Sequence, residues 1–350
     1  MITIKVPARI CFFGDHQDYL GLPVIAGAID RFINLKGTKN TEQKFNINLQ
    51  DIGTHISLRL DDVSTQVADG DYFRSGMALL KKQGLEFQQG YDISISGNIP
   101  INAGLSSSSA LVVTWIKFLI AVQETAFTFK DTQIGQLAYE AEVVYFKQPG
   151  GLMDQYTIAQ RGMLYIHTQS GESNSLSSKI GTIIVAESSI KKQTLEVLKN
   201  AKEYALQIIA TVKEHDSSFD ISESSVEDYQ RYLHIVPEEY RAYWYASIFN
   251  FDITKKAKQE FKKDSPDVEK IGILMNQHQG ILQNQIQNTP SKMIKMMDKA
   301  CKSGAYGAKI IGSGGGGCMV ALTDENSKSK VIEAFLDAGA VKAYEVKIYI

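Results

Sequence analysis

The stretch NIPINAGLSSSSA, residues 98–110, stands between an alternating segment, YDISISG (91–97), and an apolar run, LVVTWIKFLIAV (111–122). The alternation predicts a strand and the apolar run predicts a buried helix. Serine is a poor residue inside a helix and a good cap, but one cap needs only one serine. A glycine turn and four serines at a helix N-terminus are typical of an anion-binding loop, because free amides and the helix dipole favour negative charge there. A capped helix in a tight turn would explain the same spacing.

The composition is that of an ordinary globular protein and excludes several functions. The chain has 350 residues, of which 44% are apolar and 22% charged, and its net charge is -2. This balance gives no general attraction to nucleic acid, and no run of about 18 apolar residues predicts a membrane span. The three cysteines (Cys11, Cys301 and Cys318) lack the spacing of a metal site or a disulfide framework. We expect a cytoplasmic monomer or homodimer without nucleic-acid or membrane partners.

Two parts of different character follow one another along the chain. Residues 1–185 mix alternating strands and helices, beginning with a strand, a break at Pro7, a second strand and a turn at Gly14. Residues 186–350 are mainly amphipathic helices with a small sheet, and their last strand could return to the first part. This order predicts an α+β fold of two lobes with a cleft between them.

A second loop, GSGGGGC (312–318), has five glycines between two apolar strands. So many glycines carry an entropic cost, and close approach of the backbone to phosphate would explain them. A flexible hairpin is the alternative interpretation. No helix follows at once, so the loop does not match a dinucleotide-binding fingerprint.

Two further segments concentrate polar side chains. RICFFGDHQDY (9–19) groups short acids and a histidine after a strand, which suits recognition of several sugar hydroxyls, although a surface turn would look similar. In QPGGLMDQY (148–156), Asp154 stands among apolar neighbours, where an acid needs either a partner or a chemical role. A helix N-cap is the alternative for Asp154.

Together these four motifs resemble those of the GHMP small-molecule kinases. PINAGLSSSSA is similar to the family's P-x-x-x-G-L-x-S-S-A motif, and KIIGSGGGGCMVAL to its C-terminal glycine motif. VPARICFFGDHQDYLGL and PGGLMDQ resemble the galactokinase branch in particular. The motifs follow the family order from residue 7 to residue 321, so the resemblance spans nearly the whole chain.

The resemblance implies a fold, an activity and a set of site residues. The fold would be the two-lobed GHMP kinase fold, with a ribosomal-protein-like first lobe (1–185) and a ferredoxin-like, helix-rich second lobe (186–350). The activity would be ATP-dependent phosphorylation of a monosaccharide, at the anomeric hydroxyl, with Mg²⁺. The implied catalytic residues are Asp154 and Arg9, and the implied Mg²⁺ ligands are Ser108 and Glu142. The implied sugar-binding residues are Asp15, His16, Asp18, Tyr19 and Gly151. The implied ATP-binding residues are Gly104, Leu105, Ser106, Ser107, Ser108, Ser109, Gly314 and Gly315.

Some positions depart from the galactokinase pattern. Asp15 replaces a glutamate, Ser313 and Gly315 stand where alanine and phenylalanine are usual, and Lys199 occupies the approximate place of a tyrosine near the sugar. These differences leave open a heptose, a uronic acid or a non-sugar alcohol such as mevalonate as the acceptor. A ligand sensor without catalysis is the alternative of another class, and the presence of Arg9, Ser108, Glu142 and Asp154 argues against it.

Overall fold

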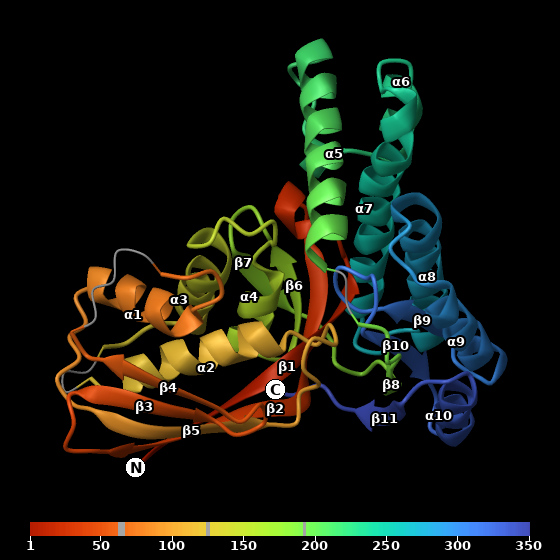
Figure 1. Cartoon of the computed structure of the whole chain (residues 1–350). Helices are drawn as coiled ribbons and strands as arrows, with labels where there is room; N and C mark the ends of the chain where they lie inside the picture. Colours follow the sequence, from red (N-terminus) through yellow and green to blue (C-terminus); the bar gives the residue numbers. More distant parts are fainter. Residues whose placement is uncertain (62–66, 124–126, 192–193) are drawn as a thin grey trace.

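The computed structural model describes residues 1–61, 67–123, 127–191 and 194–350, and it shows two lobes built on separate sheets (Figure 1). In the first lobe, β1 pairs with β2, and the remaining strands follow the order β4-β3-β5-β2-β6-β7. The strands of this sheet are β1 (Ile2–Phe13), β2 (Val24–Lys39), β3 (Lys44–Leu49), β4 (Thr54–Arg59), β5 (Tyr91–Gly97), β6 (Met163–His167) and β7 (Glu172–Ser175).

Helices pack on this sheet in two layers. They are α1 (Tyr72–Lys82), α2 (Ser107–Ala121), α3 (Asp131–Tyr139), the π-helix η2 (Glu140–Val144) and α4 (Met153–Gln160). α2 contacts β1 and β2 on one side and α1 and α3 on the other. This sandwiched position explains why the run after the serines is apolar on every side, since a helix buried all round has no polar face.

The second lobe carries a four-stranded antiparallel sheet in the order β11-β8-β10-β9. Its strands are β8 (Thr182–Glu187), β9 (Gly307–Ile310), β10 (Cys318–Thr323) and β11 (Lys342–Val346). Its helices are α5 (Thr194–His215), α6 (Val226–Tyr232), α7 (Arg241–Phe261), α8 (Val268–Ile281) with the π-helix η5 (Leu282–Ile286), α9 (Ser291–Lys302) and α10 (Lys328–Asp337). Helices after β8 and after β10 give the ferredoxin-like connectivity, so the two-lobed α+β architecture is confirmed.

Three details differ from the sequence interpretation. β1 runs through Pro7 without a break, and its pairing with β2 shifts register between Pro7 and Ala8, since an irregularity of this kind tolerates a residue without an N–H. The predicted boundary after residue 185 falls inside β8, and the chain passes between the two sheets in residues 176–181. β11 stays in the second sheet, and the residues after it return to the first lobe, where Tyr349 N donates to Ala28 O at 2.9 Å.

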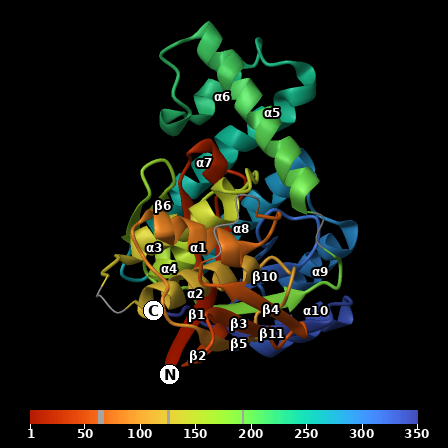
Figure 2. The ribbon, with the colours of Figure 1, turned by 60° about the vertical axis from the view of Figure 1, so that its left-hand side comes forward.

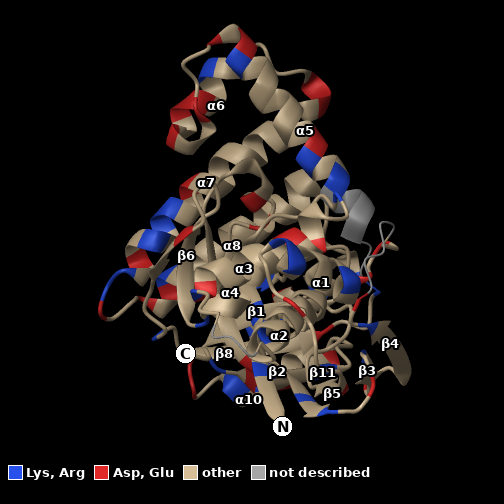
Figure 3. Ribbon diagram, turned by 90° about the vertical axis from the view of Figure 1, so that its left-hand side faces the viewer, with Lys and Arg blue, Asp and Glu red and all other residues tan. Residues whose placement is uncertain are grey.

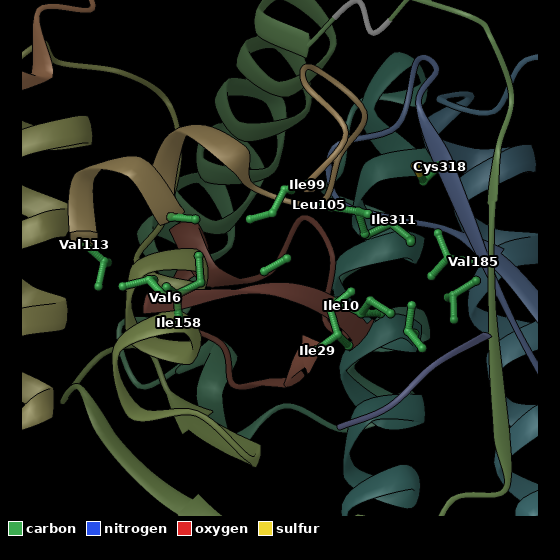
Figure 4. Close-up of a cluster of buried hydrophobic side chains, with 14 of the residues drawn as sticks. Val6, Ile10, Ile29, Ile99, Leu105, Val113, Ile158, Val185, Ile311 and Cys318 are labelled. Carbon is green, nitrogen blue, oxygen red and sulfur yellow. The ribbon is translucent and has the colours of Figure 1, made fainter. Parts of the chain in front are cut away.

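The two lobes share one hydrophobic core. Figure 4 shows Val113 and Ile158 from the first lobe joined through Ile10 to Ile311 and Val185 of the second lobe. α5, α6 and α7 extend beyond this core and pack through a separate apolar cluster around Trp244 (Figures 1 and 2). In the described ranges, none of the helices has the length and apolar character needed to span a membrane.

Candidate active site

A cleft of about 470 Å³ lies where the serine loop, the turn after β1, the segment before α4 and the glycine loop meet. We call it the serine-loop cleft. Of its described lining residues, Arg9 is the permanent cation, whereas five are carboxylates (Asp15, Asp18, Asp69, Glu142 and Asp154). Residues from all four distant motifs therefore converge in one cleft, although Tyr19, Leu105, Gly314 and Gly315 do not line it.

Arg9 and Asp154 form the central ion pair of the cleft. Arg9 Nε donates to Asp154 Oδ1 at 2.7 Å, and Nη2 donates to Oδ2 at 2.8 Å, which is the two-pronged geometry that arginine makes with carboxylates. Arg9 is buried and Asp154 is partly exposed, so the acid faces the cleft with the cation behind it. Burial by itself would lower the pKa of Arg9, but the charge of Asp154 outweighs it and the pKa is raised. The pair therefore presents a fixed, negatively charged oxygen to a ligand.

The serine loop is held against this pair. Arg9 Nη1 donates to Gly104 O at 2.7 Å, and the hydroxyl of Ser106 donates to Asp154 Oδ2. Ser106 precedes α2 in the left-handed region (φ 59°), and its side chain makes no capping bond. Sequence reasoning treated the serines as caps or phosphate ligands, whereas the first of them binds the predicted catalytic acid.

The other predicted loop residues have different surroundings. Ser107 and Ser108 begin α2 and line the cleft, so their hydroxyls and the helix N-terminus face it. Ser109 also lines the cleft but is almost wholly buried, and it accepts a long bond from Gln155 Nε2 (3.4 Å). Leu105 is fully buried in the core instead of lining the cleft (Figure 4).

Glu142 provides a site that suits a hard cation. It lies on η2 and is buried, and its Oε2 accepts from Gln155 Nε2 at 2.7 Å. Burial raises the pKa of Glu142, although hydrogen bonds from Gln155, Ser108 and Ser109 oppose the rise. In the described ranges no group of three or more His, Cys, Asp or Glu side chains forms a metal site within the protein alone. A buried carboxylate beside a cleft-facing hydroxyl fits Mg²⁺, which binds few protein oxygens and usually shares its shell with phosphate and water.

Asp18 and Gly151 both line the cleft and pack tightly against each other. A Cβ on Gly151 would overlap the carboxylate of Asp18, so only glycine fits at this position. Asp18 Oδ1 accepts from Tyr19 N at 3.0 Å. Burial, and secondly the charge of Asp154, raise the pKa of Asp18 to about 7. This acid can therefore carry a proton near neutral pH and can either donate or accept a hydrogen bond.

His16 joins the turn after β1 to the glycine loop. Its Nε2 lies 3.0 Å from Ser313 O and its Nδ1 lies 3.0 Å from the hydroxyl of Tyr19. Nε2 also lies 3.1 Å from Nδ2 of Asn288, so Ser313, Asn288 and Tyr19 together hold the imidazole. His16 lines the cleft, whereas Tyr19 lies behind it and orients the imidazole. Tyr19 is therefore placed as a support and not as a lining residue.

Asp15, predicted to bind the sugar, lines the cleft and forms a buried ion pair. Its Oδ2 accepts from Lys309 Nζ at 2.6 Å, its Oδ1 accepts from Gly312 N at 2.9 Å, and both side chains are fully buried. Lys309 also donates to Cys11 O and Ile310 O. Burial alone would raise the pKa of Asp15, but Lys309 outweighs it and the pKa is lowered. Sequence reasoning missed Lys309, whose place in an apolar strand before the glycine loop was the available signal.

The glycine loop divides between the cleft and the second lobe. Gly312 and Ser313 line the cleft. Gly314 and Gly315, predicted to bind ATP, pack on Asn288 instead: a Cβ on Gly314 would meet it, and Gly315 N donates to its carbonyl at 2.6 Å. Asn288 was not predicted, and Nδ2 of its side chain also donates to Ser313 O.

Comparison with known proteins assigns the family. Residues 71–162 match the model of the GHMP kinases N terminal domain, and residues 257–341 match that of the GHMP kinases C terminal domain. The chain belongs to the GHMP kinases. Members of this family are phosphotransferases, and the prediction that the protein is a kinase is confirmed.

Individual relatives divide between two activities. The chain is 26% identical to a galactokinase of Ligilactobacillus salivarius, covering 99% of this chain and 90% of the relative. It is 27% identical to a mevalonate kinase of Thermococcus sibiricus, covering 97% and 94%. Its fold is similar to the crystal structure of Lactococcus lactis galactokinase complexed with galactose, with a TM-score of 0.86 at 20% sequence identity, covering 99% and 93%. Relatives at these identities do not identify the acceptor substrate, so the acceptor is inferred from the residues of the cleft.

Proposed function

We propose that this protein transfers the γ-phosphoryl group of ATP to a hydroxyl of a neutral monosaccharide, at the anomeric position, in the serine-loop cleft. The observation that carries the proposal is the ion pair of Arg9 and Asp154 beside the N-terminus of α2. One end of the cleft offers helix amides and hydroxyls to phosphates, and the other offers the carboxyls and imidazole of the turn after β1 to an acceptor.

In the proposed mechanism, Asp154 accepts a hydrogen bond from the attacking hydroxyl and aligns its oxygen with the phosphoryl group. The proton passes to Asp154 as the O–P bond forms, and ADP leaves. Three hydrogen bonds, two from Arg9 and one from Ser106, fix the Asp154 carboxylate, so it contributes mainly by positioning the attacking hydroxyl. That role suits phosphoryl transfer, whose transition state is loose and depends on alignment and charge stabilisation.

Charge stabilisation in this mechanism comes from several groups. Arg9 lies behind Asp154 and offsets negative charge as the phosphoryl group approaches an acid-rich cleft. The amides at the start of α2 and the hydroxyls of Ser107 and Ser108 receive phosphate oxygens. Ser108 and Glu142 are the residues that would hold Mg²⁺, which supplies charge neutralisation of the triphosphate when bound.

The charge of the cleft favours a neutral acceptor. A uronic acid or mevalonate brings a carboxylate, and a buried carboxylate needs a cation or several donors near it. Arg9, the permanent cation among the described lining residues, already donates to Asp154 and Gly104. Asp18 and His16 instead suit hydroxyls, which both donate and accept. An aldose or heptose therefore fits better than an anionic alcohol, and Asp15 acts through the turn and glycine loop rather than by touching the sugar.

The test is ADP release from ATP and Mg²⁺ over a panel of aldoses and heptoses, with glucuronate, galacturonate and mevalonate as anionic acceptors. We expect turnover with at least one neutral sugar and none with mevalonate. Turnover with mevalonate and with no sugar would show that the acceptor is a non-sugar alcohol. ATP binding without turnover on any acceptor would favour the ligand-sensor alternative. A cytoplasmic location is also part of the proposal, because Cys11 and Cys301 carry free thiols.

A further inference from the structure

A second and larger cavity lies on the other side of the loop before α2. It measures about 870 Å³, within the range of small-molecule sites. We call it the rear cavity. Residues 98–103 form one wall, and residues 187–191, Gly317 and the start of β11 form the others. It is therefore bounded by both lobes, and none of the predicted site residues lines it.

The charge of the rear cavity is opposite to that of the serine-loop cleft. Its charged lining residues in the described ranges are three cations (Arg31, Lys191 and Lys342) and one carboxylate, Glu187. The hydroxyl of Tyr344 donates to Glu187 Oε1 at 3.1 Å, and the guanidinium of Arg31 lies over the Tyr344 ring at 4.5 Å. Lys191 and Lys342 are exposed at the surface, so their ammonium groups can reach an incoming anion.

The remaining lining groups suit a small ring that carries hydroxyls. Asn98, Asn102, Ser188 and Ser189 bring amides and hydroxyls, which can serve several hydroxyl groups. Apolar contacts are available from Ile99, Pro100, Ile101, Ile190 and Val341. We propose that the rear cavity binds a sugar monophosphate, with the phosphate at Lys191 and Lys342 and the ring between residues 98–102 and 188–190.

A ligand in the rear cavity would act on the serine loop. Asn102 and Ala103 line both the rear cavity and the serine-loop cleft. Ala103 O accepts from Cys318 N at 2.7 Å, and the next residue, Gly104, accepts from Arg9. Asn102 adopts a left-handed conformation (φ 55°), which is strained for a residue with a side chain. Occupation of the rear cavity therefore changes turnover through the loop that holds Arg9, without competing for the acceptor position.

The binding test uses the whole protein and does not depend on the proposed acceptor. Galactose 1-phosphate, glucose 6-phosphate and inorganic phosphate are titrated calorimetrically at constant ionic strength, with the ATP analogue AMPPNP and Mg²⁺ at saturation. In Lys191→Glu/Lys342→Glu, we expect the affinity for at least one sugar phosphate to fall roughly tenfold or more, because two charge-assisted contacts are reversed. A matched variant, Lys262→Glu/Lys330→Glu, should bind as the unaltered protein does.

The outcomes separate the ligand classes. We call Lys191→Glu/Lys342→Glu the rear-cavity variant. The proposal is supported if this variant alone loses affinity for the sugar phosphate and if inorganic phosphate binds more weakly than the sugar phosphate to the unaltered protein. Equal losses in both variants would indicate general electrostatics and overturn it, as would no binding or unchanged binding in the rear-cavity variant. If inorganic phosphate binds more tightly than either sugar phosphate, the ligand of the rear cavity is free phosphate and not a sugar phosphate. In kinetic assays, the added sugar phosphate should alter turnover of the unaltered protein but not of the rear-cavity variant.

Discussion

The two cavities on either side of the 98–104 loop have opposite charge although they share two lining residues. The serine-loop cleft combines five carboxylates with Arg9, whereas the rear cavity combines three cations with Glu187. Figure 3 shows acidic and basic residues dispersed over the rest of the ribbon, as expected for a net charge of -2. The comparison shows that one loop can separate an acid-rich cleft, where we propose that ATP and a neutral acceptor bind, from a cation-rich cavity, where we propose that an anion binds.

The largest expected effect is on Asp154, the acid at the centre of the cleft. Asp154→Asn keeps the shape but removes the proton acceptor, so turnover should fall about 10²- to 10⁴-fold. Binding of AMPPNP, measured by calorimetry, should change little because the helix N-terminus remains. Asp337→Asn, at an exposed acid on α10, is the matched control and should keep full activity. A variant of Asp154 that retains most of its activity would remove Asp154 from the mechanism.

The next effect concerns the buried pair beneath the cleft. Lys309→Met leaves the carboxylate of Asp15 buried without its cation, so the free energy of unfolding should fall by about 3–5 kcal/mol in urea denaturation. Asp15→Asn/Lys309→Met removes both charges and should recover much of that loss. Lys309→Arg should retain stability better than Lys309→Met. If Lys309→Met is as stable as the unaltered protein, the pair does not anchor the glycine loop to the turn after β1.

A moderate effect is expected at the metal position. Glu142→Gln removes a carboxylate whose pKa is raised by burial, so the folded apoprotein should not be destabilised by losing its charge. The Mg²⁺ concentration for half-maximal turnover should rise roughly tenfold or more. Glu140→Gln, on the same π-helix but outside the lining of the cleft, is the control. Unchanged Mg²⁺ dependence in Glu142→Gln would assign the metal to other groups.

The smallest effect is a pH dependence from Asp18. Its pKa is raised from 3.8 to about 7 in the folded protein, so the folded state binds this proton more tightly than the unfolded chain does. The stabilising contribution is therefore complete below about pH 4 and is lost as the pH rises to about 7. Asp18→Asn should remove this decline from the unfolding free energy measured between pH 5 and pH 8. If the unfolding free energies of the unaltered protein and of Asp18→Asn depend on pH in the same way, Asp18 is ionised over the whole range from pH 5 to pH 8.

The sequence motifs identified many residues that line the cleft, but not the residues that hold these side chains in position. Arg9, Ser108 and Asp154 stand in short motifs with a chemical reason, whereas Glu142 was identified only through the resemblance to the GHMP kinases. Asn288 was missed because an asparagine after a helix has no local signature. Lys309 was missed because a lysine in an apolar strand shows that a partner is needed but not which residue it is. Their partners, Asp15 and Ser313, lie far away in the sequence and become neighbours only when the lobes pack.

The sequence by itself determined the two-lobed α+β fold through local periodicity, and it indicated the kinase family through the resemblance of four short motifs to those of the GHMP kinases. Tertiary structure alone decided that Ser106 binds Asp154, that Asp15 is neutralised by Lys309, and that Gly314 and Gly315 pack on Asn288. It also created the rear cavity, whose cations come from β2, the segment after β8 and β11. The physical reason is that burial and charge pairing depend on three-dimensional distance, which a one-dimensional pattern does not contain.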